Sequence, residues 1–449
     1  MLQDGVFTFS DDGTTIIGCS EDIQGDIVIP DGVIIIKERA FDNCREITSV
    51  YIPDNVKEIK HSAFNKCYNL KSVRLPSGLS CIGYDVFSYC RHLRTINIPV
   101  GISEIGDSAF SCSGLQSITI PDGVLRIGKE AFIGCDSLES IILPNGLTII
   151  DDYAFANCHH LKSVIIPNTV KTIGNHAFSG CDPLFEIEIP NSVEYIGDYA
   201  FECTSLESIE IPSSVKTIGR KIASLKHIFV SKNNPSYVSE KSVLFSKDKH
   251  ELLLYPTGSE DTTYIIPQSV VKIADSAFSG CKLQSVSIHS NVKQIGDRAF
   301  CGSALKSIVI PEGIELIGEE TFRWSQLESV TFPTSLTKIS AFAFCECKNL
   351  KIVDIPEGVK YIGRSAFCFC YGLEKVYIPS SVTFFGSGAF GWNSLKEMHI
   401  RLEDLVVVKE EFTGYIHKEE CTLFVPYGTK YAYSHHPYFK DFARIVTED

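Results

Sequence analysis

Hydrophobic and polar residues alternate along this chain in a unit that recurs about every 22 to 23 residues. Residues 166–190 read IPNTVKTIGNHAFSGCDPLFEIEIP, and residues 355–379 read IPEGVKYIGRSAFCFCYGLEKVYIP. The segment L-x-S-[IV]-x-[IL]-P has the two-residue period of a half-buried strand, and proline, which has no N–H to donate, ends it. We therefore expect the strands of about fifteen successive units to stack as a parallel sheet along one side of a solenoid.

The other half of the unit, V-x-x-I-G-x-x-A-F, turns a Val or Leu, an Ile and a Phe inward, while its Gly permits a tight bend. Burying one ring contributes about 1.5 to 3 kcal/mol, too little to stabilise a single unit against its ordering entropy. We therefore predict that the rings stack from unit to unit. The expected column is Phe41, Phe64, Phe87, Phe110, Phe132, Phe155, Phe178, Phe201, Phe278, Phe300, Phe322, Phe344, Phe367 and Phe390.

The period breaks in three places, which divides the chain into five segments. The N-terminus and the stretch around SVLFSKDKHELLLY both have the apolar arms and polar turn of a β-hairpin, and the last part of the chain loses the repeat. An open solenoid end exposes strand edges and core, so terminal caps are expected. The predicted segments are a hairpin cap (1–28), a first leucine-rich repeat array (29–230), a hairpin insert (231–265), a second array (266–400) and a C-terminal cap (401–449).

The seventeen cysteines follow the repeat rather than a disulfide or metal pattern. Nine lie three residues after a column Phe, and Cys112 and Cys203 lie two residues after one, so we assign all eleven to one buried repeat position. The exceptions are two C-x-C pairs, Cys345 with Cys347 and Cys368 with Cys370. Four thiolates on adjacent coils could hold zinc, and Cys345 could form a disulfide with Cys368, but loop-filling free thiols are the favoured interpretation.

Composition excludes several classes of function. A formal net charge of −14 and a pI near 5.4 argue against a nucleic-acid partner. No apolar run reaches the roughly 18 residues of a membrane span, and Met1–Gly5 has neither a basic nor an apolar leader region. We find no nucleotide-binding, hydrolase or metal-site motif, so we predict a non-enzymatic protein without catalytic residues, cofactor or metal.

Period-two geometry points the Ser and the variable residue of each strand out of the same sheet face. The Ser column is monotonous and the neighbouring column varies, and sixteen rows at about 4.8 Å give a face roughly 75 Å long. Exposed apolar rows beside acidic ones are suited to an anchored contact. The candidate ligand-binding residues are Tyr51, Arg74, Asn97, Ile142, Ile165, Glu188, Glu210, Phe229 and Tyr377.

The unit I-P-x-x-V-x-x-I-G-x-x-A-F-x-x-C-x-x-L-x-S-I-x-I-P resembles the BspA-like leucine-rich repeat over nearly the whole chain. The resemblance implies an α/β-type repeat solenoid, a right-handed superhelix with a parallel sheet on one face and short strands and irregular or short helical turns on the other. It also implies similarity to bacterial and protozoan surface antigens and adhesins that bind matrix proteins or host cells. No catalytic residues come with it.

Two functional hypotheses follow. The first is a secreted or cell-surface binding protein that recognises an extracellular matrix or host protein, with a glycan as the alternative ligand. The second is a cytoplasmic protein-interaction scaffold, favoured by the many free thiols and the missing leader. The sequence does not identify the partner or the oligomeric state.

Overall fold

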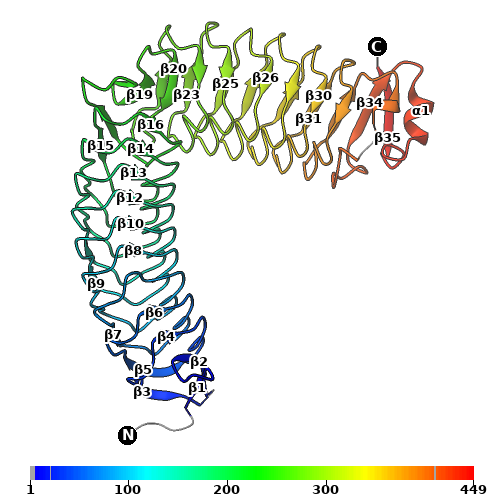
Figure 1. The fold of residues 1–449 in the computed structure, drawn as a ribbon. Helices are drawn as coiled ribbons and strands as arrows, with labels where there is room; N and C mark the ends of the chain where they lie inside the picture. Colours follow the sequence, from blue (N-terminus) through cyan, green and yellow to red (C-terminus); the bar gives the residue numbers. More distant parts are fainter. Residues whose placement is uncertain (1–5, 21, 409–410, 449) are drawn as a thin grey trace. The chain divides into compact units, whose positions relative to one another are not determined.

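The computed structural model describes residues 6–20, 22–408 and 411–448, and divides into two compact units, Met1–Ser236 and Tyr237–Asp449. Met1–Gly5, on which the expected absence of a leader depends, lies outside the described residues. Each unit is a stack of coils joined by short parallel strands (Figure 1). The helices found in the described ranges are one α-helix, α1 (Lys430–His435), and one 3₁₀ turn, η1 (Leu405–Val407). The expected repeat solenoid is therefore confirmed. The five-segment division within it stays a prediction.

The L-x-S-[IV]-x-[IL]-P segments form one row of strands, here called the serine strands. In the first unit they are β3 (Gln24–Val28), β5 (Glu46–Tyr51), β7 (Ser72–Arg74), β9 (Ser117–Thr119), β11 (Ser140–Ile142), β15 (Ser208–Ile211) and β17 (His227–Val230). In the second unit they are β21 (Thr263–Ile265), β23 (Ser285–Ser287), β25 (Ser307–Val309), β27 (Ser329–Thr331), β29 (Ile352–Asp354), β31 (Lys375–Ile378) and β33 (Glu397–Ile400). Their burial alternates as the sequence predicts, with Ser117 and Thr119 exposed around the buried Ile118.

The V-x-x-I-G segments form a second row of two-residue strands, here called the isoleucine strands. In the first unit they are β4 (Ile35–Ile36), β6 (Glu58–Ile59), β8 (Glu104–Ile105), β10 (Arg126–Ile127), β12 (Ile149–Ile150), β13 (Thr172–Ile173), β14 (Tyr195–Ile196) and β16 (Thr217–Ile218). In the second they are β22 (Lys272–Ile273), β24 (Gln294–Ile295), β26 (Leu316–Ile317), β28 (Lys338–Ile339), β30 (Tyr361–Ile362) and β32 (Phe384–Phe385).

The isoleucine row is the more continuous of the two. From β8 to β16 it forms one six-stranded parallel sheet, whereas the serine strands of the same coils form only the separate pairs β9–β11 and β15–β17. The expected parallel stacking of the serine strands is therefore confirmed, and it takes the form of several short sheets. Proline closes most of the serine strands after few residues, and strand pairing between the coils is more continuous on the isoleucine side.

A third hydrogen-bonded side lies at the corner around each column Phe. The residue two positions before the Phe and the residue two positions after it adopt left-handed backbone, as at His176 (φ 54°) and Gly180 (φ 74°) beside Phe178. Their N–H groups donate to carbonyls of the next coil, at 2.9 Å from His176 to Asp198 and at 2.8 Å from Gly180 to Glu202. These bonds between coils hold side-chain-bearing residues in a conformation that otherwise favours glycine.

The phenylalanine column forms as predicted within each unit, with the rings stacked in turn from Phe41 to Phe201 and from Phe278 to Phe390. Phe155, for example, lies between Phe132 and Phe178 with centroid distances of 5.3 and 5.2 Å, and its ring is fully buried. In seven coils a cysteine that lies three residues after the Phe points back under the stack. The Cys158 Sγ donates to the Phe132 carbonyl at 3.3 Å, and six other coils carry an equivalent bond.

We call the position three residues after the column Phe the ladder position, and its bond to the carbonyl of the preceding coil the ladder bond. The residue at this position differs from the prediction in two coils. Ser113 and Thr204, not Cys112 and Cys203, lie three residues after their column Phe, and Ser113 Oγ contacts Cys135 Sγ at 3.3 Å. Cys112 and Cys203 instead take the left-handed corner position, with φ of 53° and 54°. The corner around the Phe is fixed by its bonds to the next coil, so a shortened unit loses its residue after the ladder position.

Both units begin their isoleucine row with an antiparallel hairpin. In the first, β1 (Phe7–Phe9) pairs with β2 (Thr15–Cys19), which runs parallel to β4. In the second, β18 (Tyr237–Glu240), β19 (Val243–Ser246) and β20 (Glu251–Leu254) pair in turn, and β20 runs parallel to β22. At the other end, β34 (Thr422–Pro426) and β35 (Arg444–Glu448) extend the serine row beyond β33, and the Tyr433 hydroxyl of α1 donates to the Leu402 carbonyl at 2.8 Å.

Candidate binding face

The outward surface of the serine strands, here called the serine face, carries the predicted candidate residues. Apolar side chains stand out of it although each flanks a buried neighbour: Ile142 is 62% exposed and Ile165 is 86% exposed. Asn97, Glu188 and Glu210 are exposed as well. The alternation of the strand therefore places these side chains in solvent, as the sequence predicts.

The serine face opens where its strands stop pairing. Between β11 and β15, the serine segments at 163–165 and 186–188 form no strand. Two adjoining hollows lie there, of about 310 and 460 Å³, and both are lined by residues 185–188. The isoleucine strands of the same coils, β12 to β14, stay paired throughout, so strand pairing between these coils is lost on the serine side and kept on the isoleucine side.

Six residues around these hollows form what we call the acidic–apolar patch. They are Ile165, Phe185, Glu186, Glu188, Glu210 and Phe229. The exposed fraction is 86% for Ile165, 62% for Phe185 and 53% for Phe229. The structure therefore brings together four of the predicted candidates from successive coils, and adds two residues to them.

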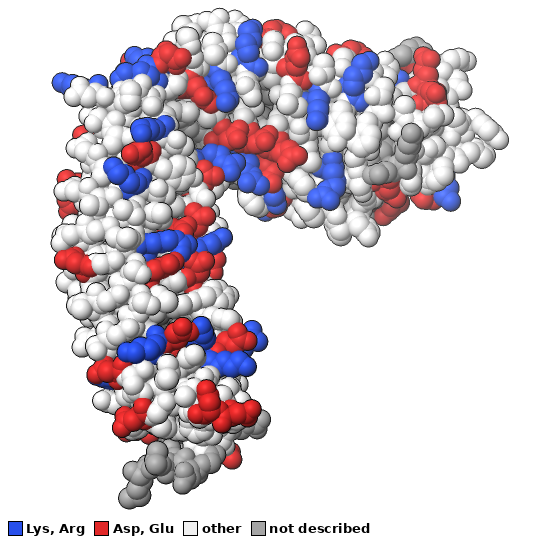
Figure 2. Space-filling model, in the orientation of Figure 1, with Lys and Arg blue, Asp and Glu red and all other residues white. Residues whose placement is uncertain are grey.

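The carboxylates of the patch differ from the acidic groups that pair with nearby basic side chains. On the face drawn in Figure 2, basic side chains generally lie beside acidic ones. Arg126, for example, pairs with Glu104, with Asp107 at 3.0 Å and with Asp151 at 2.7 Å. Within the part of the chain that the structure describes, the carboxylates of the patch form no ion pair. Their negative charge is therefore available to a partner.

Sequence reasoning did not select Phe185 and Glu186. The segment LFEIEIP carries Glu186 where other units have Ser, and Phe185 in the position before it. The break in the Ser column at Glu186 was the available signal, although Glu397 occupies the same position in β33, which pairs with both β31 and β34. The unpaired stretch of the serine row lies at the coil of Glu186.

Other predicted candidates are engaged within the protein. Arg74 donates to the Ile52 carbonyl at 2.7 Å, pairs with Asp54 at 2.7 Å and lies over the Tyr51 ring at 5.0 Å. Hydrogen bonding to Arg74 holds the pKa of Asp54 well below its usual value. Asn97 lines a separate hollow with Arg74. Tyr51, Arg74 and Asp54 therefore contact one another at the surface of the first unit, which also carries the patch.

Tyr377 belongs to the second unit and stacks on His399 at 4.4 Å. His399, which the strand period places on the variable outward column, is buried rather than exposed. Its ring also stacks on Phe424 at 4.2 Å, because β34 continues the row and covers it. Its Nδ1 lies 2.8 Å from Glu448.

The seventeen cysteines all lie in the described ranges, and none of them is in a disulfide. Burial raises the pKa of Cys135 to about 12, which keeps its proton on sulfur for the ladder bond. In the described ranges, no group of three or more His, Cys, Asp or Glu side chains could hold a metal ion, the two C-x-C pairs included. No described helix is long and apolar enough to cross a membrane.

Comparison with known proteins agrees with this architecture. Residues 20–139, 126–237 and 259–340 match the BspA type leucine rich repeat region, a family described by six repeat copies. A leucine-rich repeat protein from Bacteroides ovatus is 29% identical, with a TM-score of 0.55, and the alignment covers 84% of this chain and 93% of that one. A leucine rich cell surface protein from Faecalibacterium prausnitzii is also 29% identical, with a TM-score of 0.47 and coverage of 85% and 89%. No curated protein matches the sequence.

Proposed function

Because the chain belongs to the BspA-type leucine-rich repeat family, we propose that it is a non-catalytic protein that binds a protein partner through the acidic–apolar patch. We further propose that this binding occurs at the cell surface and serves adhesion or the recognition of a matrix or host protein. The observation that carries the proposal is the patch itself. Three large apolar side chains stand in solvent beside three carboxylates without ion pairs among the described residues.

Apolar side chains at this exposure suit the centre of an interface. Phe185 and Phe229 border the same 460 Å³ hollow, so a partner side chain that enters between their rings displaces water from it. Aromatic anchors in a pocket give most of the binding energy of protein interfaces. Ile165 extends the apolar area across the adjoining hollow.

The carboxylates define the chemistry of the partner. Glu186, Glu188 and Glu210 favour a surface that carries Lys or Arg around an apolar centre. Opposite charges at the rim accelerate encounter and make it sensitive to salt. The partner should therefore be a protein with a basic patch, and association should slow as ionic strength rises.

Binding to purified matrix proteins and host-cell receptor ectodomains tests the proposal, measured by surface plasmon resonance with the full chain. For any partner bound, the double variant Glu188→Lys/Glu210→Lys should lower the association rate at low salt. Phe229→Ser should raise the dissociation rate and weaken binding by more than about tenfold, the loss expected for a buried aromatic anchor.

Glu46→Lys is the matched control, because Glu46 is an exposed glutamate on another serine strand of the same unit. If Glu46→Lys impairs binding as much as the patch variants do, or if the patch variants bind normally, the patch is not the interface. If no protein of the panel binds, the proposed matrix or host interaction fails.

The free thiols favour a second candidate, an intracellular protein-interaction scaffold. The two are separated by labelling intact native cells with a membrane-impermeant biotin ester before lysis. A labelled chain supports the surface location. A chain that is labelled only after lysis supports the scaffold.

A further inference from the structure

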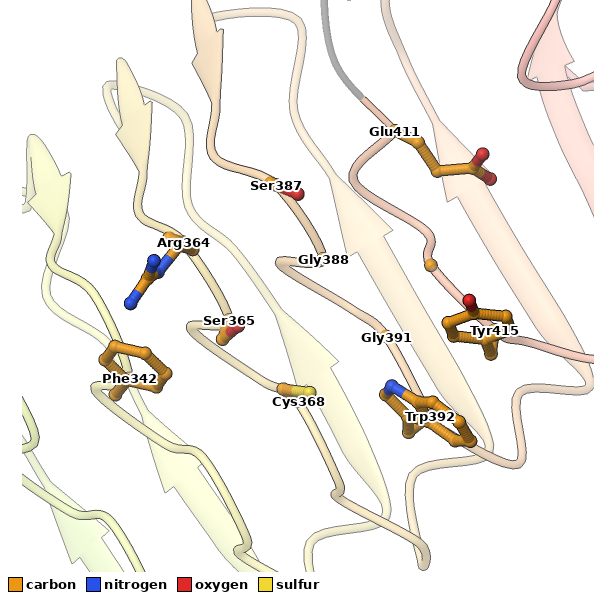
Figure 3. Close-up of a pocket in the computed structure, with 11 residues that line it drawn as sticks. Phe342, Arg364, Ser365, Cys368, Ser387, Gly388, Gly391, Trp392, Glu411 and Tyr415 are labelled. Carbon is orange, nitrogen blue, oxygen red and sulfur yellow. The ribbon is translucent and has the colours of Figure 1, made fainter.

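The second unit carries a hollow of about 610 Å³ on the corner side of its coils, away from the serine strands (Figure 3). Phe342 and Arg364 lie at one end of it, and Trp392 and Tyr415 lie at the other. The floor between them is formed by glycine and serine residues of successive coils. A volume of this size is typical of small-molecule sites.

Missing side chains create the hollow. Phe342, Ser365 and Gly388 occupy the same left-handed corner position in three successive coils, with φ of 57°, 52° and 63°. A Cβ added at Gly388 would meet nothing closer than Ser365 Oγ at 3.8 Å, so the side chain found in the preceding coils is replaced by open space. Gly391 and Gly414 touch one another beside it, where a Cβ on Gly414 would lie 3.0 Å from the Gly391 Cα.

Two aromatic rings border this space and are open to solvent. Trp392 is 46% exposed and Tyr415 is 74% exposed, with ring centroids 4.4 Å apart. Ring stacking at the corner is not in itself a sign of binding, because Tyr153, His176 and Tyr199 stack at 4.6 and 4.9 Å in the first unit. What distinguishes Trp392 and Tyr415 is the glycine-lined hollow beside the rings.

The charges of the hollow leave one cation available. Glu411 is balanced by Lys418 at 2.7 Å and accepts from Thr413 at 3.1 Å. Arg364 lies over the Phe342 ring at 5.0 Å and is exposed, and none of the ion pairs in the described ranges involves it. A guanidinium can take a carboxylate through two parallel hydrogen bonds.

We propose that this hollow binds an acidic oligosaccharide. The Trp392 ring lies between those of Phe369 and Tyr415, at centroid distances of 5.7 and 4.4 Å, so the apolar C–H face of a pyranose ring packs against the exposed ring of Tyr415 and the edge of Trp392. The hydroxyls of the sugar bond to Ser365 and Ser387, and a sugar carboxylate pairs with Arg364. An exposed aromatic ring combined with hydroxyl groups and one cation matches the amphipathic surface of such a sugar. The inference does not rest on the proposed protein binding, because the acidic–apolar patch lies in the other unit.

Tryptophan fluorescence gives a direct test, because the chain has two tryptophans and Trp324→Phe leaves Trp392 as the reporter. The full chain with this change is titrated with trisaccharides of glucuronic, galacturonic and mannuronic acid and with sialyllactose. The carboxyl-reduced trisaccharides and lactose are the neutral counterparts. At least one acidic sugar should shift the emission to saturation, and its neutral counterpart should bind about tenfold more weakly, as expected for loss of one charge-assisted pair.

Three variants assign the contacts. Arg364→Gln should abolish the preference for the acidic sugar, and Tyr415→Ala should weaken both acidic and neutral sugars. Tyr371→Ala is the matched control, because Tyr371 is 52% exposed and lies beside Phe369 but does not line the hollow. Circular dichroism establishes that each variant is folded.

Several outcomes would overturn the proposal. Absence of an emission change with every acidic sugar rules out the site, and equal affinity for acidic and neutral sugars rules out the role of Arg364. An equal loss in Tyr371→Ala and Tyr415→Ala would show that the effect is not specific to the hollow. None of these results would bear on the patch of the first unit.

Discussion

Phe155 can show whether ring stacking stabilises the phenylalanine column beyond burial. Its ring is fully buried, with planes within 5° of Phe132 and 12° of Phe178. Phe155→Leu keeps an apolar side chain but removes both ring contacts. At about 0.5 to 1.5 kcal/mol for each aromatic pair, the lost stacking amounts to about 1 to 3 kcal/mol. A volume-conserving apolar exchange alone costs less than about 1.5 kcal/mol.

A double-mutant cycle separates the two contributions. Phe155→Leu and Phe178→Leu remove a shared contact, so their effects on the free energy of unfolding should be non-additive by about 0.5 to 1.5 kcal/mol. Phe132→Leu with Phe178→Leu is the control, because these rings are separated by Phe155 and should be additive within about 0.5 kcal/mol.

Urea unfolding followed by circular dichroism measures the free energies of the cycle. Native-state amide exchange adds a local measure, because the Phe155 N–H donates to the Ala177 carbonyl at 2.8 Å. If the adjacent pair proves as additive as the separated pair, stacking contributes nothing beyond burial, and the column is held by apolar area alone.

Three further predictions concern other contacts. Cys158→Ser should retain a donor to the Phe132 carbonyl, whereas Cys158→Val should remove that bond, leave the carbonyl with the Cys135 N–H at 3.2 Å as its donor, and cost about 0.5 to 1.5 kcal/mol, as measured by urea unfolding; equal costs would exclude the bond from sulfur. Cys19 and Cys44 have sulfurs 3.0 Å apart, so diamide should link them, and peptide mapping that finds both alkylated would refute this. Arg74 lowers the pKa of Asp54, so the stability from this pair is present above the usual value of 3.8 and is lost as the pH falls below it. Arg74→Gln should therefore flatten the acid limb of the stability profile, and an unchanged limb would contradict the assignment.

The sequence predicted the features that depend on spacing alone. Phe155 and Cys158 recur at fixed offsets, so their column and ladder follow from the period. Cys112 was misplaced because the length of a unit does not reveal where a residue is lost. The corner bonds decide that, and they join residues that are far apart in sequence.

The candidate sites were less accessible to sequence reasoning. Exposure of Ile165 follows from strand alternation, but the loss of pairing beside it depends on how neighbouring coils spread. The residue Gly388 alone does not predict a hollow. The hollow arises because the preceding coils carry side chains at the same corner position, where Gly388 has none. The sequence did not reveal that Arg74 pairs with Asp54, because the two residues lie in neighbouring coils, twenty positions apart.

The unequal pairing of the two strand rows has a mechanical consequence. Around residues 163–188, the isoleucine row is fully bonded while the serine row is not. Bending that narrows the open side breaks no backbone bond there, whereas bending that pulls β12 away from β13 breaks a ladder. The coil stack is therefore compliant in one direction and stiff in the other. A ligand seated on the open side can draw the coils together around itself, while the isoleucine strands and the corner bonds carry tension on the stack.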